Sequence, residues 1–288
     1  MTDISNKCLW ITGASSGIGA ALATAASAAG AQVILSGRRT EALSDVAKTL
    51  AGPCLILPFE ATDYPALDDI TARAWAWQGQ VDVLINNAGV SQRSVAVDTA
   101  PEVYQQMLNI DLLAPIWLTQ LQLQRMVTAG GGHIVAISSL AGRIGAPLRT
   151  AYCAAKHGLL GYMDALRCEV ETLHNIRVTT VLPGSVATDV SRNALTGDGS
   201  RRGRSDDVID GGDHPMDCAR AILAAISANT PELIFAKGNE LALTQLRHDD
   251  PDTFLPPRRV MGKRPSGHLT PNANNNTGAQ PPLLLGRP

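Results

Sequence analysis

Tyr152 and Lys156, four residues apart, form the pair in this sequence best suited to proton transfer. They lie in a run that predicts a helix, so their side chains share one helix face a turn apart. An ammonium group close to a phenol favours the phenolate, the form that accepts a proton in general acid and base catalysis. The same spacing also describes an ordinary exposed helix pair, so the neighbouring residues must decide between the two interpretations.

A hydroxyl is expected beside this pair. The apolar run 134–137 predicts a buried strand that ends at Ser138 and Ser139, thirteen residues before the tyrosine. Ligands of parallel sheets bind at the carboxyl ends of the strands. The Ser139 hydroxyl could there donate a hydrogen bond to a substrate carbonyl oxygen. Together with Tyr152 and Lys156, it predicts a site that binds and protonates such an oxygen.

A glycine-rich turn follows the first predicted strand. Gly13, Gly17 and Gly19 have the spacing GxxxGxG, and good helix formers follow at 20–29. Glycine lets the backbone turn sharply and approach a pyrophosphate, whose charge a helix N-terminus stabilises. A merely flexible turn is the alternative, but a strand before the glycines and a helix after them favour dinucleotide binding.

The end of the second predicted strand indicates which dinucleotide binds. About twenty residues beyond the glycines, an NAD-selective site places an acid on the ribose 2′-hydroxyl. Arg38 and Arg39 stand there instead, and guanidinium groups suit a 2′-phosphate. The pair therefore favours NADP(H) over NAD(H), the alternative being that both residues simply begin a solvated helix.

The elements that must position these residues alternate along the chain. Short apolar runs predict strands near 7–12, 32–36, 54–58, 82–85, 133–138, 176–182 and 232–235, with helical segments between them. This alternation is typical of an α/β fold with a Rossmann-type, doubly wound parallel sheet of about seven strands and helices on both faces. Ser139, the glycine turn and the two arginines fall at the carboxyl ends of its strands.

Two segments interrupt the alternation. Residues 190–215 are rich in glycine and charge without apolar periodicity, which predicts a long mobile loop of the kind that acts as a lid. After about residue 260 the chain becomes rich in Gly, Pro, Asn and Arg, which predicts disorder. We therefore predict one domain over 1–260, with a substrate loop at about 190–215, and a disordered tail over 261–288.

The motifs together resemble the classical short-chain dehydrogenase/reductase family. The resemblance rests on the order and separations, across residues 7–235 or so, of Thr12-Gly13, Gly17-Ile18-Gly19, Asn86-Asn87-Ala88-Gly89, Ser139, Tyr152 with Lys156, and Pro183-Gly184. It implies hydride transfer between nicotinamide and a carbonyl or secondary alcohol carbon. By this resemblance Ser139 positions the carbonyl, and Tyr152 gives or takes the proton. Lys156 would also hold the nicotinamide ribose, and Asn109 would anchor a water of the proton relay.

The resemblance also implies the remaining cofactor contacts. Residues 60–63 resemble the family's Asp-Val-Thr-Asp stretch with Glu60 in first place, and Ile18, Val186 and Thr188 match positions beside the nicotinamide. The cofactor-binding residues predicted are Gly13, Ser15, Ser16, Gly17, Ile18, Gly19, Arg38, Arg39, Glu60, Ala61, Asn87, Ala88, Gly89, Tyr152, Lys156, Pro183, Gly184, Val186 and Thr188. The segment 193–200 further resembles the substrate loop of the dehydrogenase/reductase member 7-type branch.

Composition restricts the partners. With 24 basic and 26 acidic residues among 288, the chain offers no broad cationic surface to nucleic acid or anionic lipid. No signal-peptide pattern and no apolar window of roughly 20 residues occurs, so we expect a soluble protein without a membrane partner. Five cysteines without a CxxC pair favour a reducing, cytoplasmic location, and the histidines lack metal-ligand spacing, so no metal is expected.

Two helical runs, 102–127 and 150–174, have wide apolar faces, which predicts a homodimer or homotetramer.

The leading hypothesis is an NADP-dependent reductase or dehydrogenase for a small-molecule carbonyl or alcohol. One alternative is a non-catalytic NADP-sensing regulatory protein, against which the intact Ser139, Tyr152 and Lys156 argue. The other is an epimerase or dehydratase that uses the same Tyr/Lys pair with a transient hydride, which the GxxxGxG spacing and the short C-terminal portion disfavour.

Overall fold

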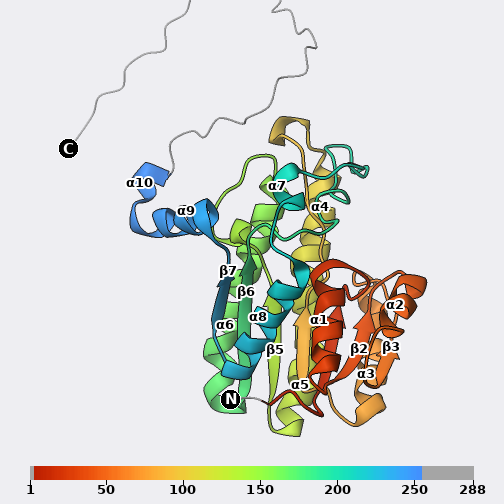
Figure 1. The fold of residues 1–288 in the computed structure, drawn as a ribbon. Helices are drawn as coiled ribbons and strands as arrows, with labels where there is room; N and C mark the ends of the chain where they lie inside the picture. The colour runs from red at the N-terminus through yellow and green to blue at the C-terminus, as the bar shows by residue number, and fades with distance from the viewer. Residues whose placement is uncertain (1–2, 255–288) are drawn as a thin grey trace, which may run out of the picture. The chain divides into compact units, whose positions relative to one another are not determined.

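A seven-stranded parallel sheet forms the centre of the computed structural model, which describes residues 3–254 (Figure 1). The strands are β1 (Cys8–Thr12), β2 (Gln32–Ser36), β3 (Cys54–Ile56), β4 (Val83–Asn86), β5 (Gly132–Ile137), β6 (Ile176–Pro183) and β7 (Glu232–Phe235). Their order across the sheet is β3-β2-β1-β4-β5-β6-β7. The first three strands are therefore added toward one edge of the sheet and the later strands toward the other edge. Such a switch point, here between β1 and β4, opens a ligand crevice at the carboxyl ends of these strands.

Helices cover both faces of the sheet. One layer contains α1 (Gly17–Ala28), α2 (Thr40–Ala47) and α8 (Pro215–Ala228), and the other contains α3 (Leu67–Gln78), α5 (Ala114–Ala129) and α6 (Thr150–His174). Alternate residues of each strand enter the two cores, because successive side chains of a strand point to opposite faces. Leu9 and Ile11 of β1 pack into the first core and Trp10 into the second. The predicted doubly wound fold and all seven strands are confirmed.

The predicted helix 102–127 is not continuous. The chain forms α4 (Pro101–Leu108), a π-helical turn (Asn109–Leu113) and then α5. Pro115 stands in the first turn of α5 and has no N–H to donate to the carbonyl of residue 111, so the regular α-helical bonding cannot run through this point. Wide π turns occur frequently at functional sites, and this one begins at the candidate residue Asn109.

The segment 190–215 has more structure than its sequence predicts. It contains a short helix, α7 (Asp207–Asp210), and its Leu195 exchanges backbone hydrogen bonds with Ser91 and Arg93 at 2.7 and 2.8 Å. Its mobility stays a prediction. Two helices that the sequence analysis did not foresee, α9 (Gly238–Asp249) and α10 (Pro251–Phe254), follow β7. The predicted tail 261–288 lies outside the described residues, and within these residues every helix is too short or too polar to cross a membrane.

Candidate active site

The glycine turn between β1 and α1 needs glycine for reasons of space and backbone conformation. Gly13 and Gly17 have φ angles of +67° and +56°, which side chains with a Cβ rarely adopt. A Cβ on Gly13 would lie 2.8 Å from the Cα of Ala88, and one on Gly19 would lie 2.3 Å from the Gly13 carbonyl oxygen. The glycine turn is therefore packed tightly against the loop that follows β4. The first turn of α1, which follows the glycine turn, has backbone N–H groups that an α-helix leaves without an internal partner and that can bind an anion.

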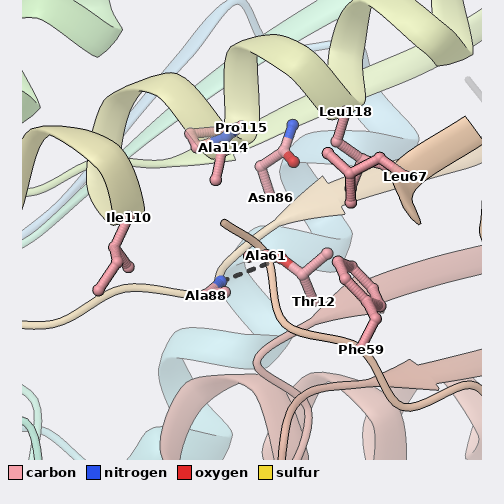
Figure 2. Close-up of a pocket in the computed structure, with 10 residues that line it drawn as sticks. All are labelled: Thr12, Phe59, Ala61, Leu67, Asn86, Ala88, Ile110, Ala114, Pro115 and Leu118. Atoms are coloured by element: carbon pink, nitrogen blue, oxygen red, sulfur yellow. Dashed lines mark hydrogen bonds between the residues drawn. The ribbon is translucent and has the colours of Figure 1, made fainter. Parts of the chain in front are cut away.

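Thr12 and Asn87 tie this turn to the neighbouring strand end. The Thr12 hydroxyl accepts hydrogen bonds from the backbone N–H groups of Asn87 and Ala88, both at 3.0 Å, and the Asn87 amide donates to the Thr12 carbonyl at 2.8 Å. Figure 2 shows the Thr12–Ala88 bond beside a small hollow, between α5 and the strand ends, whose lining includes Phe59 and Ile110. These bonds fix the spacing of the two loops that flank the switch point.

A cleft of about 730 Å³ runs from this turn across the carboxyl ends of the strands. All the predicted cofactor residues line it except Gly19, which packs behind the turn, and Ser139 lines it as well. Asn109 does not line the cleft although its neighbour Ile110 does, and the Asn109 carbonyl accepts a hydrogen bond from the Tyr64 hydroxyl at 3.3 Å. The cleft size falls within the range of small-molecule and cofactor sites. Asn193, Leu195 and Arg201 of the predicted substrate loop also line the cleft, and the lining residues that sequence reasoning missed include Phe59, Gln106 and Ile110.

Three of the four candidate catalytic residues, Ser139, Tyr152 and Lys156, come from the end of β5 and the first two turns of α6. Tyr152 is half-buried, whereas Lys156 is buried with its Nζ 5.7 Å from the centre of the Tyr152 ring. The Lys156 ammonium donates to the Ile137 carbonyl at 3.1 Å, and the Ser138 hydroxyl donates to the Lys156 carbonyl at 3.2 Å. These bonds hold α6 against the strand end, so Ser139, Tyr152 and Lys156 face one cleft.

Asp111 is a buried acid beside this group that sequence reasoning missed. Its side chain is fully buried in the π-helical turn, with Oδ2 3.8 Å from Lys156 Nζ. Its Oδ1 accepts a hydrogen bond from the backbone N–H of Val90 at 2.8 Å, and its Oδ2 has no hydrogen-bond partner among the described residues. Burial raises the pKa of Asp111 to about 6, although the nearby Lys156 charge opposes this shift. The only signal in the sequence was a charged residue inside an apolar run.

We expect Asp111 to make the stability of the protein depend on pH. Because its pKa rises from 3.8 to about 6 on folding, the folded state binds more protons than the unfolded state between these values, so its contribution to stability is lost as pH rises through about 6. Asp111→Asn cannot titrate. From about pH 4.5 to about pH 7.5, the free energy of unfolding of the wild type, measured in urea, should fall relative to that of Asp111→Asn by on the order of 2 kcal/mol. A difference that stays constant with pH would show that Asp111 does not titrate in this window.

Two arginines border the opposite end of the cleft. Arg38, after β2, lies 3.3 Å from a carboxylate oxygen of Glu60. Arg39 donates to the hydroxyls of Ser15 and Ser16 in the glycine turn, both at 3.0 Å. Arg39 also immediately precedes α2. The sequence analysis offered a 2′-phosphate site and the start of a helix as alternatives, and Arg39 stands where both would place it. Both guanidinium groups are within the cleft lining, where an anionic group of a ligand could reach them.

The turn after β6 is held by a helix that the sequence analysis did not foresee. Glu240, in the first turn of α9, accepts hydrogen bonds from the backbone N–H of Ser185 at 2.9 Å and from its hydroxyl at 2.6 Å. Ser185 directly follows Pro183 and Gly184, which line the cleft. This contact positions the predicted nicotinamide end of the site.

The comparisons with known proteins agree with this geometry. The family model for short chain dehydrogenases matches residues 7–198, two thirds of the chain, so the chain belongs to the short-chain dehydrogenase/reductase family. Dehydrogenase/reductase SDR family member 7B of Bos taurus is 37% identical over 271 residues, which cover 91% of this chain and 82% of that protein. The protein of the same name from Danio rerio is 39% identical over 272 residues, covering 91% and 86%. The predicted resemblance to the member 7 branch is thereby confirmed.

Two solved structures are similar in fold. A short-chain dehydrogenase from Streptomyces avermitilis has a TM-score of 0.77 at 30% identity, covering 86% of this chain and 94% of that one. A short chain dehydrogenase/reductase from Burkholderia phymatum in complex with NAD has a TM-score of 0.80, covering 91% and 100%, but at 20% identity it supports the fold alone. Together with the relatives, these findings identify the chain as an NAD(P)-dependent oxidoreductase that acts on CH–OH or C=O groups.

Proposed function

We propose that this protein is an NADP(H)-dependent oxidoreductase that moves a hydride between nicotinamide and the carbon of a carbonyl or secondary alcohol, with Tyr152 as the general acid and base. The observation that carries the proposal is that Ser139, Tyr152 and Lys156 line the same cleft as the glycine turn and the two arginines. The glycine turn fits a dinucleotide because Gly13 and Gly17, at positive φ angles, let the backbone turn sharply from β1 into the N-terminus of α1, where N–H groups stabilise a pyrophosphate.

The nicotinamide, when bound, supplies or accepts the hydride. In the reducing direction, Ser139 donates a hydrogen bond to the carbonyl oxygen and Tyr152 transfers its hydroxyl proton to that oxygen as the carbon receives the hydride. The buried ammonium of Lys156, fixed by the Ile137 carbonyl, stabilises the phenolate that remains. In the oxidising direction the same phenolate accepts the alcohol proton. Asn109 would anchor a water through which the proton is replaced.

Cofactor preference tests the proposed role of the two arginines. In a fluorescence titration we expect NADPH to bind at least about tenfold more tightly than NADH, a difference of about 1.4 kcal/mol. Arg38→Ala or Arg39→Ala should remove this preference, because each removes a guanidinium from the expected 2′-phosphate site. Arg220→Ala, which breaks only an exposed pair with Asp217 on α8, is the matched control. Equal binding of the two cofactors by the wild type would refute the NADP(H) assignment.

We also propose that the protein is a homodimer or homotetramer. Trp117 and Val127 on α5, which are 49% and 41% exposed, and Leu173 near the end of α6, at 75%, are large apolar residues that a partner subunit would bury. In a monomer these side chains expose apolar surface to water, which is unfavourable in free energy, and association of two subunits would bury that surface. The predicted cytoplasmic location stays a prediction.

A further inference from the structure

One carboxylate joins the substrate loop to the rest of the site. Asp206 Oδ2 lies 2.7 Å from Arg93 Nε and accepts a hydrogen bond from the Ser191 hydroxyl at 2.8 Å. Its Oδ1 lies 2.6 Å from Arg202 Nη1, and Arg149 Nη2 lies 4.0 Å from Oδ2. We call these five residues the Asp206 clasp. Three guanidinium groups and one hydroxyl thus share a single carboxylate.

The members of the Asp206 clasp come from three parts of the chain that meet near the catalytic residues. Arg93 follows β4 and the Asn86–Gly89 motif, and Arg149 immediately precedes α6, three residues before Tyr152. Ser191 and Arg202 lie in the substrate loop, as does Asp206 itself. The clasp therefore connects the loop both to the cofactor side of the cleft and to the helix that carries the proton donor.

Burial makes the clasp costly to break. The Arg93 side chain is only 6% exposed, and this burial lowers the pKa of its guanidinium, while the Asp206 carboxylate opposes that shift. Although partial burial disfavours the ionised carboxylate, hydrogen bonds from Arg93, Ser191 and Arg202 hold the pKa of Asp206 well below its usual range. Removal of the carboxylate would leave a buried cation without its counter-ion and next to two like charges, a loss that is strongly destabilising in proteins.

The clasp acts on the wall of the cleft. Asn193, Leu195 and Arg201, which belong to the substrate loop, line the cleft. Leu195 is also bonded through its backbone to Ser91 and Arg93, so the clasp residue Arg93 is joined to the wall itself. A shift of the loop would move these lining residues away from the position where the carbonyl binds.

We propose that Asp206 is a positioning residue for substrate: through Arg93, Arg149 and Arg202 it holds the substrate loop against the Tyr152 end of the cleft and thereby sets the affinity for the carbonyl compound. The inference rests on the proposed function. It distinguishes the loop, which binds the carbonyl partner, from the glycine turn, which binds the cofactor without help from the clasp.

The test compares Asp206→Asn with the wild type and with Asp217→Asn, which loses a carboxylate from an exposed ion pair elsewhere. Hydrogen exchange of the backbone N–H groups of Arg93 and Leu195 should accelerate at least about tenfold in Asp206→Asn, because the loop opens locally more often. The KM for cyclohexanone, benzaldehyde or diacetyl should rise by about tenfold, with NADPH affinity within about twofold of wild type. Asp217→Asn should change none of these quantities.

Two results would overturn the inference: unchanged exchange in residues 190–206 of Asp206→Asn, or a loss of NADPH affinity as large as the rise in KM. If Asp206→Asn does not fold, Arg202→Gln, which leaves the buried Arg93–Asp206 pair in place, is measured under the same criteria, with changes of about threefold expected. Exchange and NADPH binding do not require turnover. A wild type that binds NADPH but reduces no carbonyl therefore contradicts the proposed function, whereas the exchange data still decide whether the clasp holds the loop.

Discussion

Tyr152→Phe is expected to lower kcat/KM for carbonyl reduction by roughly 10²–10⁴-fold, the usual contribution of a positioned general acid. The substitution removes the hydroxyl that gives the proton to the substrate and keeps the ring, which packs against the cluster that contains Val103, Met107 and Leu195. The loss should fall mainly on kcat, because the proton moves in the transition state. The measurement is the rate of NADPH oxidation at carbonyl concentrations from well below KM to saturation, which gives kcat and kcat/KM separately.

The matched control for this substitution is Tyr104→Phe. Tyr104 belongs to the same apolar cluster, and its hydroxyl is bonded at 2.8 Å to the Thr150 hydroxyl rather than facing Lys156. It should lose a neutral hydrogen bond and retain activity within about threefold. NADPH affinity should remain within about twofold of wild type in both variants. Comparable activity of Tyr152→Phe and Tyr104→Phe would refute the assignment of Tyr152 as the acid.

Gly19→Ala should weaken NADPH binding by between about tenfold and a hundredfold, because one methyl group has no space behind the glycine turn. The added Cβ would lie 2.3 Å from the Gly13 carbonyl oxygen and 2.5 Å from the Asn87 amide nitrogen. Neither atom can move away freely, because the Gly13 oxygen belongs to the backbone of the turn and the Asn87 amide is hydrogen-bonded to the Thr12 carbonyl. The turn itself must therefore shift, and with it the N–H groups expected to hold the pyrophosphate. Isothermal titration with NADPH measures the loss.

Gly145→Ala is the control for this change, since a Cβ on Gly145 meets nothing within 4 Å. It should leave NADPH affinity within about twofold of wild type and leave stability nearly unchanged. An NADPH affinity of Gly19→Ala equal to that of Gly145→Ala would mean that the turn does not form the pyrophosphate site.

Most of the fold could be predicted from the sequence because its signals are local. Strands buried on both faces appear as continuous apolar runs, such as Val33-Ile34-Leu35, and these runs locate the observed strands to within a few residues. The interruption of the 102–127 helix was missed, because apolar periodicity continues through the π-helical turn and the departure depends on Pro115 and on the burial of Asp111. The helices α9 and α10 were missed because their sequence lacks a strong apolar face.

The candidate active site likewise contains residues with a local sequence signal and residues without one. The glycine turn and the Tyr152–Lys156 pair are recognisable because each functions within a few residues of sequence. The contacts that hold them are not local: Ser185 and Glu240 are 55 residues apart and Arg93 and Asp206 are 113 apart. No spacing rule connects such residues, so Asp111, Asp206 and Glu240 become visible only when the fold brings their partners together.

Hydride transfer from NADPH to a carbonyl carbon can be tested directly by following the transferred hydrogen with deuterium. Wild type is incubated with NADPH that carries deuterium in the transferable position of its nicotinamide ring and with cyclohexanone, benzaldehyde and diacetyl, and the products are examined by mass spectrometry. We expect an alcohol with one deuterium on the former carbonyl carbon, formed by the wild type and by Tyr104→Phe but at least about a hundredfold more slowly by Tyr152→Phe. Tight binding of NADPH without transfer to any carbonyl compound would contradict this expectation and favour a sensing role for the same cleft.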